Sequence, residues 1–495
     1  MTATYFHNAR VLTMDPARPY ADDLLVDGSS VIAVGQAHRS LPGVPYAAHY
    51  DCGGAMLLPA FIDAHCHLLA AAAAARGIDC SPRAVSSIRA IQAQLRAAAA
   101  DAGPDAWMRA VGYDETQLEE RRHPSCRDLD EASPHVPVRL LHRSGHAVVL
   151  NTPAMQLAGI GTDTPEPPGA HIERFAGSGE PTGLLLEMSD VVDRVVPPLP
   201  YGEIAAGMAE VSRRYLAAGV TAVCDATHTN DVSAWELLCR LHDDGHLPLP
   251  VVVMEGAEHA GELPAAPQGT VARARHVKIM LSEVGGLSPD ERELARVVRE
   301  LHVRGRDVAV HAVEERAVAA AIDALEAAVT AMPRAHRHRI EHAALLPAGG
   351  AERMARLGVT VVTQPAFLLE QGDRYLRDVA RDKHERLYPL GDLLRAGVRI
   401  AASSDAPAGS IDALAGVRAA VERRTASGAP IGASQAVALE QALAMWTRDA
   451  AWACAEELAR GQLAPGMAAD LVLIGGEPLR VLAVWVRGVR MWPGA

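Results

Sequence analysis

Two histidines separated by one residue, His65 and His67, close an apolar run that begins at Leu57. A short apolar run of this kind is typical of a buried β-strand. Because side chains alternate along a strand, both imidazoles are expected on one face, with Cys66 packed on the other. Two imidazoles on one face at a strand end favour a metal chelate, and two core histidines with backbone partners are the alternative.

Lysine is rare in this chain, and its placement is informative. Only two of the 47 basic residues are lysines. Lys383 stands in a charged stretch typical of a solvated surface, whereas Lys278 stands in an apolar run that predicts a buried strand. Arginine cannot replace lysine where the chemistry needs an amine that loses its proton. Lys278 is therefore a candidate functional residue, and a buried ion pair with Glu283 or Asp307 is the alternative.

Eight apolar segments with strand character recur along the chain, mostly separated by Ala-, Leu- and Arg-rich helical stretches. The predicted strands are 57–65, 219–225, 249–255, 276–281, 307–312, 338–342, 359–364 and 398–404. The main predicted helices are 203–218, 289–305, 314–330 and 350–357. Eight βα units in series predict an α/β fold, the (β/α)8 TIM barrel. A doubly wound sheet is the alternative, but no GxGxxG motif follows the first strand.

Short β-like segments stand at both ends of the chain, and neither end is long enough for a core of its own. Residues 1–56 and 460–495 are therefore predicted to form one small β-sandwich domain beside a barrel domain of 57–459. A long insertion, 68–205, follows the first barrel strand and contains a predicted helix at 86–100. Because loops after barrel strands build active sites, we expect this insertion to act as a lid or specificity region.

Five of the predicted strands carry polar side chains at or near their carboxyl ends. These are His65 and His67 on the first strand, Lys278 on the fourth, His311 on the fifth, His342 on the sixth and Asp405 after the eighth. The carboxyl ends of the strands share one face of a TIM barrel, where its active sites are found. The sequence therefore predicts that these six side chains converge.

This arrangement resembles the amidohydrolase superfamily over nearly the whole chain. Within it, the sequence is similar to the branch that contains the N-substituted formamide deformylases and the YtcJ-like amidohydrolases. The segments that carry this narrower resemblance are Gly112-Tyr113-Asp114, Gly145-His146, Asn151-Thr152-Pro153-Ala154, Gly179-Glu180-Pro181-Thr182-Gly183, Arg339-Ile340-Glu341-His342-Ala343 and Pro465-Gly466-Met467-Ala468-Ala469-Asp470-Leu471.

The resemblance implies a binuclear metal centre. The first divalent metal would be held by His65, His67 and Asp405 and the second by His311 and His342. In binuclear members of the superfamily the strand-four lysine, here Lys278, is carboxylated by CO2 and bridges the metals. Two zinc ions are the expected pair, with iron, manganese or cobalt as alternatives, because histidine and carboxylate ligands suit all of them.

The implied activity is hydrolysis of a carbon–nitrogen bond other than a peptide bond, in an N-formyl or related amide of a small molecule. A hydroxide on the metals is a nucleophile at neutral pH. Asp405 would act as general base and then as general acid, returning the proton to the leaving nitrogen. Asp114, His146 and Gln364 are candidate substrate-binding residues, and hydrogen bonds that stabilise loops are their alternative role.

Two other functions remain open. Glu314 creates a His311-x-x-Glu pattern similar to that of the mononuclear deaminases of the superfamily, which act on ring amines or amidines with the glutamate as proton shuttle. Alternatively, Glu314 opens the following helix, where acidic residues are favoured. A catalytically silent binding protein on the same barrel is the third possibility, although all six candidate ligands are retained.

Composition excludes several classes of partner. The formal net charge is −13 and no Lys/Arg-rich block occurs, which argues against nucleic-acid or anionic-membrane binding. The longest bland apolar stretch, Leu68–Ala75, is too short to span a bilayer. Seven cysteines without a CxxC motif favour reduced thiols. We expect a cytoplasmic enzyme of small molecules, and an exposed barrel flank would permit a homodimer.

Overall fold

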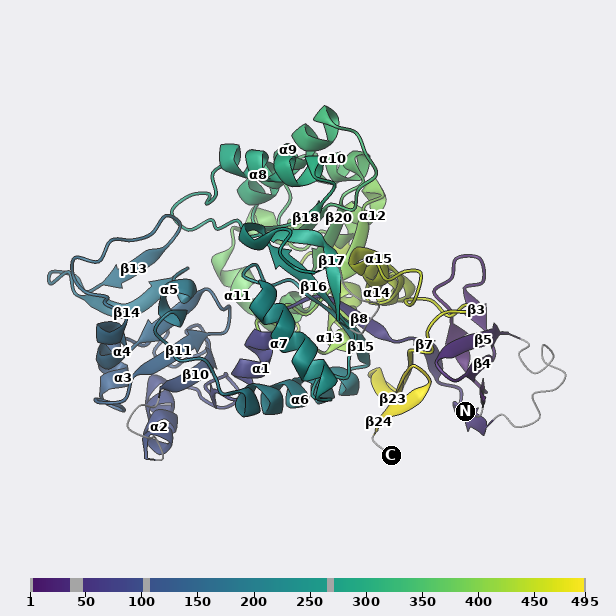
Figure 1. The fold of residues 1–495 in the computed structure, drawn as a ribbon, viewed down its shortest axis with the longest axis horizontal. Coiled ribbons are helices and arrows are strands. Elements are labelled where there is room, and N and C mark those ends of the chain that lie inside the picture. Colours follow the sequence, from purple (N-terminus) through teal and green to yellow (C-terminus); the bar gives the residue numbers. More distant parts are fainter. Residues whose placement is uncertain (1–2, 36–47, 101–106, 265–270, 494–495) are drawn as a thin grey trace. The chain divides into compact units, whose positions relative to one another are not determined.

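Eight short segments rich in Val, Ile and Ala pair in parallel and form one sheet that nearly closes on itself (Figure 1). Such residues suit strands that are buried on both faces. In sheet order the strands are β21 (Arg399–Ala402), β20 (Thr360–Thr363), β19 (Arg339–His342), β18 (Asp307–Ala312), β17 (Val271–Ile279), β16 (Val251–Gly256), β15 (Val220–Asp225) and β8 (Phe61–Cys66). The amide of Asp405 donates to the carbonyl of His65 (2.9 Å) and joins the two ends of the sheet. The predicted TIM barrel is confirmed.

The computed structural model describes residues 3–35, 48–100, 107–264 and 271–493. The chain divides into two compact units. The first consists of Met1–Leu68, Ala209–Met280 and Glu293–Ala495 and contains the barrel, and the second consists of Leu69–Met208 and Leu281–Arg292. No helix within the described ranges is both long and apolar enough to cross a membrane.

Helices follow most of the barrel strands, as the sequence predicts. They are α6 (Tyr201–Ala217), α7 (Val232–Asp243), α8 (Glu291–Val303), α9 (Glu315–Ala331), α10 (Gly350–Leu357), α11 (Ala366–Asp378), α12 (Leu390–Ala396), α13 (Ala413–Glu422), α14 (Leu439–Met445) and α15 (Arg448–Cys454). Short 3-10 helices lie at Ala257–His259, Arg381–Arg386 and Ala433–Gln435. The longest helix that lies wholly in the barrel unit, α9, buries an Ala-rich stripe with Ile322 and Leu325, a pattern that packs a helix closely on a sheet.

Small apolar side chains fill the barrel interior. One buried cluster joins residues of seven of the eight strands, including Ala64, Ala222 and Ala309, with residues of α15. Side chains from so many strands can meet only inside the barrel. The one barrel strand outside this cluster, β19, instead contributes Arg339 and Glu341, both completely buried.

The prediction of one strand over 57–65 is wrong, because this segment forms two strands with different partners. β7 (Met56–Pro59) pairs with β22 (Leu471–Gly475) of the small β-domain. After Ala60, β8 begins the barrel and pairs with β15. Both strands are buried, so the apolar run continues across the change of sheet and hides it.

Strands from both ends of the chain form the small β-domain, as predicted. One sheet has the order β5 (Ser30–Val34), β4 (Leu24–Asp27), β1 (Thr4–His7), β6 (Ala48–Asp51). The other has the order β24 (Val489–Trp492), β23 (Arg480–Val486), β22, β7, β2 (Arg10–Leu12), β3 (Tyr20–Ala21). Their facing side chains share one core, in which Phe6 and Trp485 contact edge to face with ring centroids 5.1 Å apart. In Figure 1 the labels β3, β4, β5, β7, β23 and β24 mark strands of this sandwich.

The second unit contains a six-stranded sheet that the sequence did not reveal. Its order is β13 (His171–Arg174), β14 (Pro181–Leu186), β12 (Ala147–Leu150), β11 (Val138–His142), β10 (Met108–Tyr113), β9 (Ile78–Asp79). The helices are α1 (Leu68–Ala74), α2 (Ile88–Ala99), α3 (Cys126–Asp130), α4 (Thr152–Leu157) and α5 (Ser189–Asp193). The helix predicted at 86–100 is α2, and Ser87 caps its start.

Gly183 of β14 has a backbone that no other residue could adopt without strain. Its φ is +93°, and a Cβ at this position would lie 2.3 Å from the carbonyl oxygen of Leu150. Gly179 also has a positive φ, +73°, but the nearest atom to its Cβ would be 3.7 Å away. We expect Gly183→Ala to lower the free energy of unfolding by about 3 kcal/mol, through strain and steric overlap together. Gly179→Ala should cost about 1 kcal/mol, from strain alone. Urea unfolding of both variants checks this, and equal losses would contradict it.

Two buried histidines connect three elements of the barrel unit near the amino ends of β18 and β19. The Val308 amide donates to Nδ1 of His338 (3.1 Å), so the proton of the neutral ring lies on Nε2. That nitrogen donates to Nδ1 of His302 (2.8 Å), whose Nε2 donates to the carbonyl of Met332 (2.8 Å). An added proton on either ring would place two N–H groups against each other.

This chain of hydrogen bonds predicts that the folded protein loses stability in acid. Burial, followed by the neighbouring His336, lowers the pKa of His338 to about 2, whereas an unfolded histidine titrates near 6.5. The unfolded chain therefore binds a proton that the folded chain does not, and stability falls as the pH is lowered below 6.5. From His338 alone the free energy of unfolding should fall by ~1.4 kcal/mol per pH unit between about pH 6 and pH 4. The free energy of unfolding, measured with urea at several pH values, should depend less steeply on pH in His338→Asn than in the unchanged protein, by about one proton. Equal slopes in the two proteins would refute the assignment.

Candidate metal centre

A β-bulge in β8 turns His65 towards the barrel interior. Between Asp63 and Cys66 the strand has one residue more than β15, which opposes it. Such a bulge interrupts the alternation of side chains, so that Ala64 and His65 can both face inward. Cys66 is buried and its thiol lies 3.4 Å from the carbonyl of Cys224, which agrees with a packing role.

Side chains from three strand ends meet above this bulge. Oδ1 of Asp405, which follows β21, lies 3.4 Å from Nε2 of His65 and 3.1 Å from Nε2 of His67. Nζ of Lys278, on β17, lies 3.4 Å from the same nitrogen of His65. The ligand atoms of the two histidines and the aspartate all lie within 4.8 Å of one another, close enough to hold one metal ion.

The last two predicted ligands lie beside this group. The ring centroid of His342, at the end of β19, is 5.1 Å from that of His65. The ring of His311, on β18, lies 4.4 Å from that of His342. The structure thus brings all six side chains together at the carboxyl ends of five barrel strands.

Hydrogen bonds on the far side of the rings fix two of the imidazoles. Nδ1 of His65 donates to Oε2 of Glu341 at 2.5 Å, because a carboxylate can only accept. Nδ1 of His67 is bonded to Oγ1 of Thr227 at 2.9 Å. The bond to Glu341 leaves the Nε2 lone pair of His65 directed at the space around Asp405, as a metal-binding histidine requires.

His342 gives the clearest sign of a missing partner. Its Nδ1 donates to Oε1 of Gln364 (2.8 Å), and the amide nitrogen of Gln364 donates to Ser403 (2.9 Å), which sets the orientation of the amide. Nε2 of His342 is buried and has no hydrogen-bond partner. A buried polar atom without a partner is unfavourable, and a metal ion would satisfy this lone pair. The donor set therefore fits a divalent metal.

The charges of the group also suit cation binding. Burial lowers the pKa of His65 to about 3 and also lowers the pKa of His342, so both rings are neutral at pH 7. Although burial opposes it, the hydrogen bond from His67 holds the pKa of Asp405 below its usual value. Burial also lowers the pKa of Lys278. The centre thus offers neutral nitrogen ligands and one carboxylate.

The backbone of two of these residues is strained. His342 has a φ of +72° and Asp405 a φ of +57°, values that side-chain-bearing residues rarely adopt. Positive φ in non-glycine residues is concentrated at functional sites, where the surroundings enforce it. In both residues the turn follows the end of a barrel strand and directs the side chain to the cluster.

The surroundings of Asp307 and of Glu314 bear on the alternative roles of Lys278, as part of an ion pair, and of Glu314, as a residue that opens a helix. Asp307, the proposed ion-pair partner of Lys278, is bonded to Arg275 and Arg334, each at 3.0 Å. Glu314 is exposed and immediately precedes α9, the position expected of a residue that opens a helix.

The three predicted substrate-binding residues all have protein partners. Asp114, in the second unit, accepts from the amide of Thr116 (3.0 Å) and from Gln117 (3.0 Å), which stabilises the turn after β10. His146, in the same unit, lies 3.0 Å from Glu187 and its side chain is 44% exposed. Gln364 is fully buried in the barrel unit, where both ends of its amide are bonded. Their contact with substrate remains a prediction.

A second group of acidic and histidine side chains lies in the second unit. Oε2 of Glu115 is 2.9 Å from Nε2 of His142, with Asp114 nearby. The amide of Ser144 donates to Nδ1 of His142 (3.2 Å), so Nε2 carries the proton of the neutral ring. Against the effect of burial, His142 lowers the pKa of Glu115 to about 2. The ring of His142 thus faces Glu115 with its protonated nitrogen and has no lone pair left for a metal.

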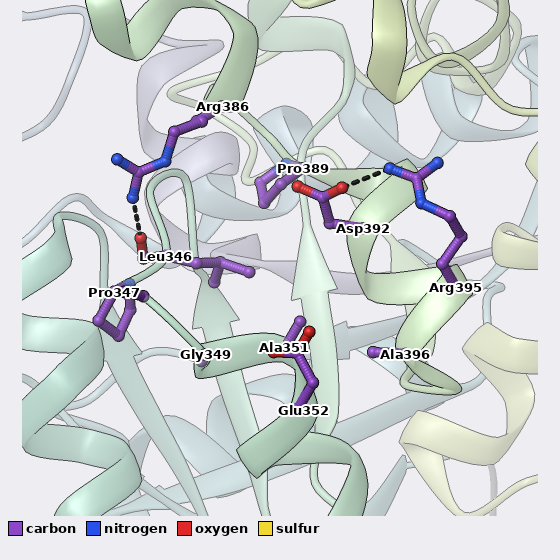
Figure 2. Close-up of a pocket in the computed structure, with 12 residues that line it drawn as sticks. Leu346, Pro347, Gly349, Ala351, Glu352, Arg386, Pro389, Asp392, Arg395 and Ala396 are labelled. Carbon is purple, nitrogen blue, oxygen red and sulfur yellow. Dashed lines mark hydrogen bonds and ion pairs between the residues drawn. The ribbon is translucent and has the colours of Figure 1, made fainter.

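A hollow of about 510 Å³ opens beside the loop that follows β19 (Figure 2). Its charged side chains pair with their surroundings: Arg386 donates to the carbonyl of Leu346 (2.5 Å), and Arg395 pairs with Asp392. None of the six predicted ligands lines it. The hollow is therefore separate from the candidate centre.

Sequence reasoning missed the role of the residues that orient the ligands, although it had named Gln364 as a candidate for substrate binding. Thr227 and Gln364 contact histidines that are distant in sequence, and no local pattern marks those contacts. Arg339 and Glu341 did leave a signal, because two charged residues at i and i+2 share one face of a buried strand. Charges on such a face need a specific partner.

Comparison with known proteins agrees with this geometry. A model described as "Amidohydrolase family" matches residues 49–489. An N-substituted formamide deformylase of Arthrobacter pascens is 29% identical over 97% of this chain and 97% of its own. A putative amidohydrolase, YtcJ, of Bacillus subtilis is 25% identical over 96% of this chain and 95% of its own. The crystal structure of an uncharacterized metal-dependent hydrolase from Pyrococcus horikoshii shares the fold, with a TM-score of 0.74, 22% identity, and coverage of 96% of this chain and 98% of that one.

Proposed function

Because this chain belongs to the amidohydrolase family and is a hydrolase of carbon–nitrogen bonds, we propose that it cleaves an N-formyl amine or a related small amide at the candidate metal centre. The observation that carries the proposal is the orphaned Nε2 of His342 beside the Nε2 atoms of His65 and His67. Divalent metals bound there would polarise the carbonyl and lower the pKa of water to roughly 7. The relative of Arthrobacter pascens, a deformylase by name, supports the choice of substrate.

In this proposal the six ligands divide between two zinc ions. His65, His67 and Asp405 would hold the first, because their ligand atoms already lie within 4.8 Å of one another. His311 and His342 would hold the second, and their adjacent rings support this assignment. Zinc accepts imidazole and carboxylate ligands without a strong geometric demand, and iron, manganese or cobalt would use the same donors.

Lys278 would be carboxylated and bridge the two ions. Burial lowers the pKa of its amine and so raises the fraction of the neutral form. Only the neutral amine has the lone pair that attacks CO2; one N–C bond forms and one proton leaves. The product is a carbamate, which supplies two oxygen ligands where the amine supplied one nitrogen.

Asp405 would move the proton during hydrolysis. Its carboxylate is ionised, because the hydrogen bond from His67 holds its pKa low, and it can accept a proton from the attacking water. The same carboxyl group then gives the proton to the leaving nitrogen as the C–N bond breaks. Water and the amide are consumed, and a carboxylic acid and an amine are released.

Metal analysis and a substrate screen test the proposal. Purified protein should contain about two metal ions per chain and release acid and amine from N-formyl or N-acyl amines. Aminopyrimidines serve as the comparison, because a deaminase that used Glu314 would release ammonia from them and contain a single metal. Protein that neither contains nor binds metal on titration would overturn the proposal.

A further inference from the structure

We propose that Glu341, held by Arg339 inside the barrel, is a positioning residue that sets the tautomer and place of His65 for metal binding. The inference rests on the proposed metal centre and extends it to two residues that touch neither metal nor substrate. Oε2 of Glu341 lies 2.5 Å from Nδ1 of His65. All three side chains are almost completely inaccessible to solvent.

Arg339 fixes both the carboxylate and the chain before His65. Its guanidinium donates to Oε1 and Oε2 of Glu341 at 2.5 and 2.8 Å. It also donates to the carbonyl of Ala64 (2.7 Å), the residue that precedes His65 in the bulge. A fourth bond reaches the carbonyl of Ala453 near the end of α15 (3.1 Å). Arg339 thus holds both the backbone beside His65 and the Glu341 carboxylate that is bonded to the His65 ring.

The surroundings of this pair make a purely structural role costly. The other seven strands contribute a cluster of apolar side chains to the interior, among them Ala64, Ala222 and Ala309. A buried ion pair in such a place is often no more stable than apolar residues of the same volume. The fold alone therefore does not account for two full charges here. The hydrogen bond to His65 accounts for these charges, because a carboxylate behind a metal-binding imidazole raises the basicity of the imidazole and fixes its orientation.

A carboxylate also does what an amide at this position could not. Both oxygens of Glu341 accept from Arg339, and one also accepts from His65. In a glutamine, the NH2 group would face either the guanidinium or the imidazole N–H. Gln364 can serve His342 as an amide because Ser403 sets its orientation. Glu341 needs no such partner, since either of its oxygens can only accept.

Metal affinity is the readout that separates positioning from structure. We would prepare Glu341→Gln and the double variant Arg339→Met/Glu341→Met, which removes both charges at similar volume. After chelation, zinc is titrated back against a competing chelator, and cobalt is added to record the visible spectrum. We expect zinc to bind 10- to 100-fold more weakly in both variants, with an altered cobalt spectrum. The double variant should remain folded by circular dichroism.

Arg334→Met is the matched control. It removes another arginine of a buried ion pair, with Asp307, at the opposite end of β18 from His311. It should lower the melting temperature and leave zinc affinity and the cobalt spectrum unchanged. A folded double variant with the zinc affinity of the unchanged protein would overturn the inference. Absence of zinc binding in the unchanged protein would instead overturn the proposed function, so the two failures are distinguishable.

Discussion

Replacing Lys278 by arginine should lower kcat by about 10³-fold, since loss of one Lewis acid removes several kcal/mol of transition-state stabilisation. The side chain is only 2% exposed and its Nζ lies 3.4 Å from Nε2 of His65. A guanidinium forms no carbamate and keeps its positive charge, so it would repel the metal that the lysine would help to bind. Metal analysis should show a fall from two ions per chain to one or none.

Lys383→Arg is the control for this substitution, because Lys383 is the other lysine of the chain. Lys383 lies 3.0 Å from Glu315 on the surface, and an arginine can keep that ion pair. Its activity and metal content should equal those of the unchanged protein. A Lys278→Arg variant that retains two metals and turns over normally would refute the bridging role.

Asp405→Asn should lower kcat by about 10³-fold, because general acid–base catalysis contributes a factor of this order. The amide keeps the size of the side chain but cannot accept the proton. It also removes the negative charge that faces Nε2 of His65 and of His67, so metal should bind more weakly as well. Activity is measured at saturating metal and substrate, which separates loss of the proton acceptor from loss of metal.

Asp412→Asn tests whether any loss of an aspartate in this part of the chain has the same effect. Asp412 precedes α13 and accepts from the amide of Ala415 (3.1 Å), as a capping residue does. Asparagine caps helices as well as aspartate, so stability and activity should both be unchanged. Retention of more than a tenth of the activity by Asp405→Asn would exclude Asp405 as the principal proton carrier.

Much of the barrel and its cluster of polar residues could be predicted from local patterns. Short continuous apolar runs, separated by helical stretches, reveal strands because most positions of each barrel strand are buried. Most of the candidate ligands were visible because they stand where such a run ends, as His311 and His342 do. The scarcity of lysine singled out Lys278 before any partner was known.

Features that depend on partners elsewhere in the chain could not be predicted. The boundary between β7 and β8 is set by pairing with β22 and β15, and both segments are buried. The bulge before His65 is defined only against the opposing strand. The sheet of the second unit has short strands, such as the two residues of β9, which leave little periodicity to detect.

The passage from β7 through Ala60 to β8 has a consequence for the order of events during synthesis. His65 is made before the segments that hold it: β7 pairs with β22, residues Leu471–Gly475, and β8 is joined to Asp405. Both supports emerge from the ribosome long after the histidine itself. An incomplete nascent chain therefore displays an HxH pair without the geometry that would capture a metal tightly. The candidate centre can take its final geometry only after Asp405 and β22 have been made.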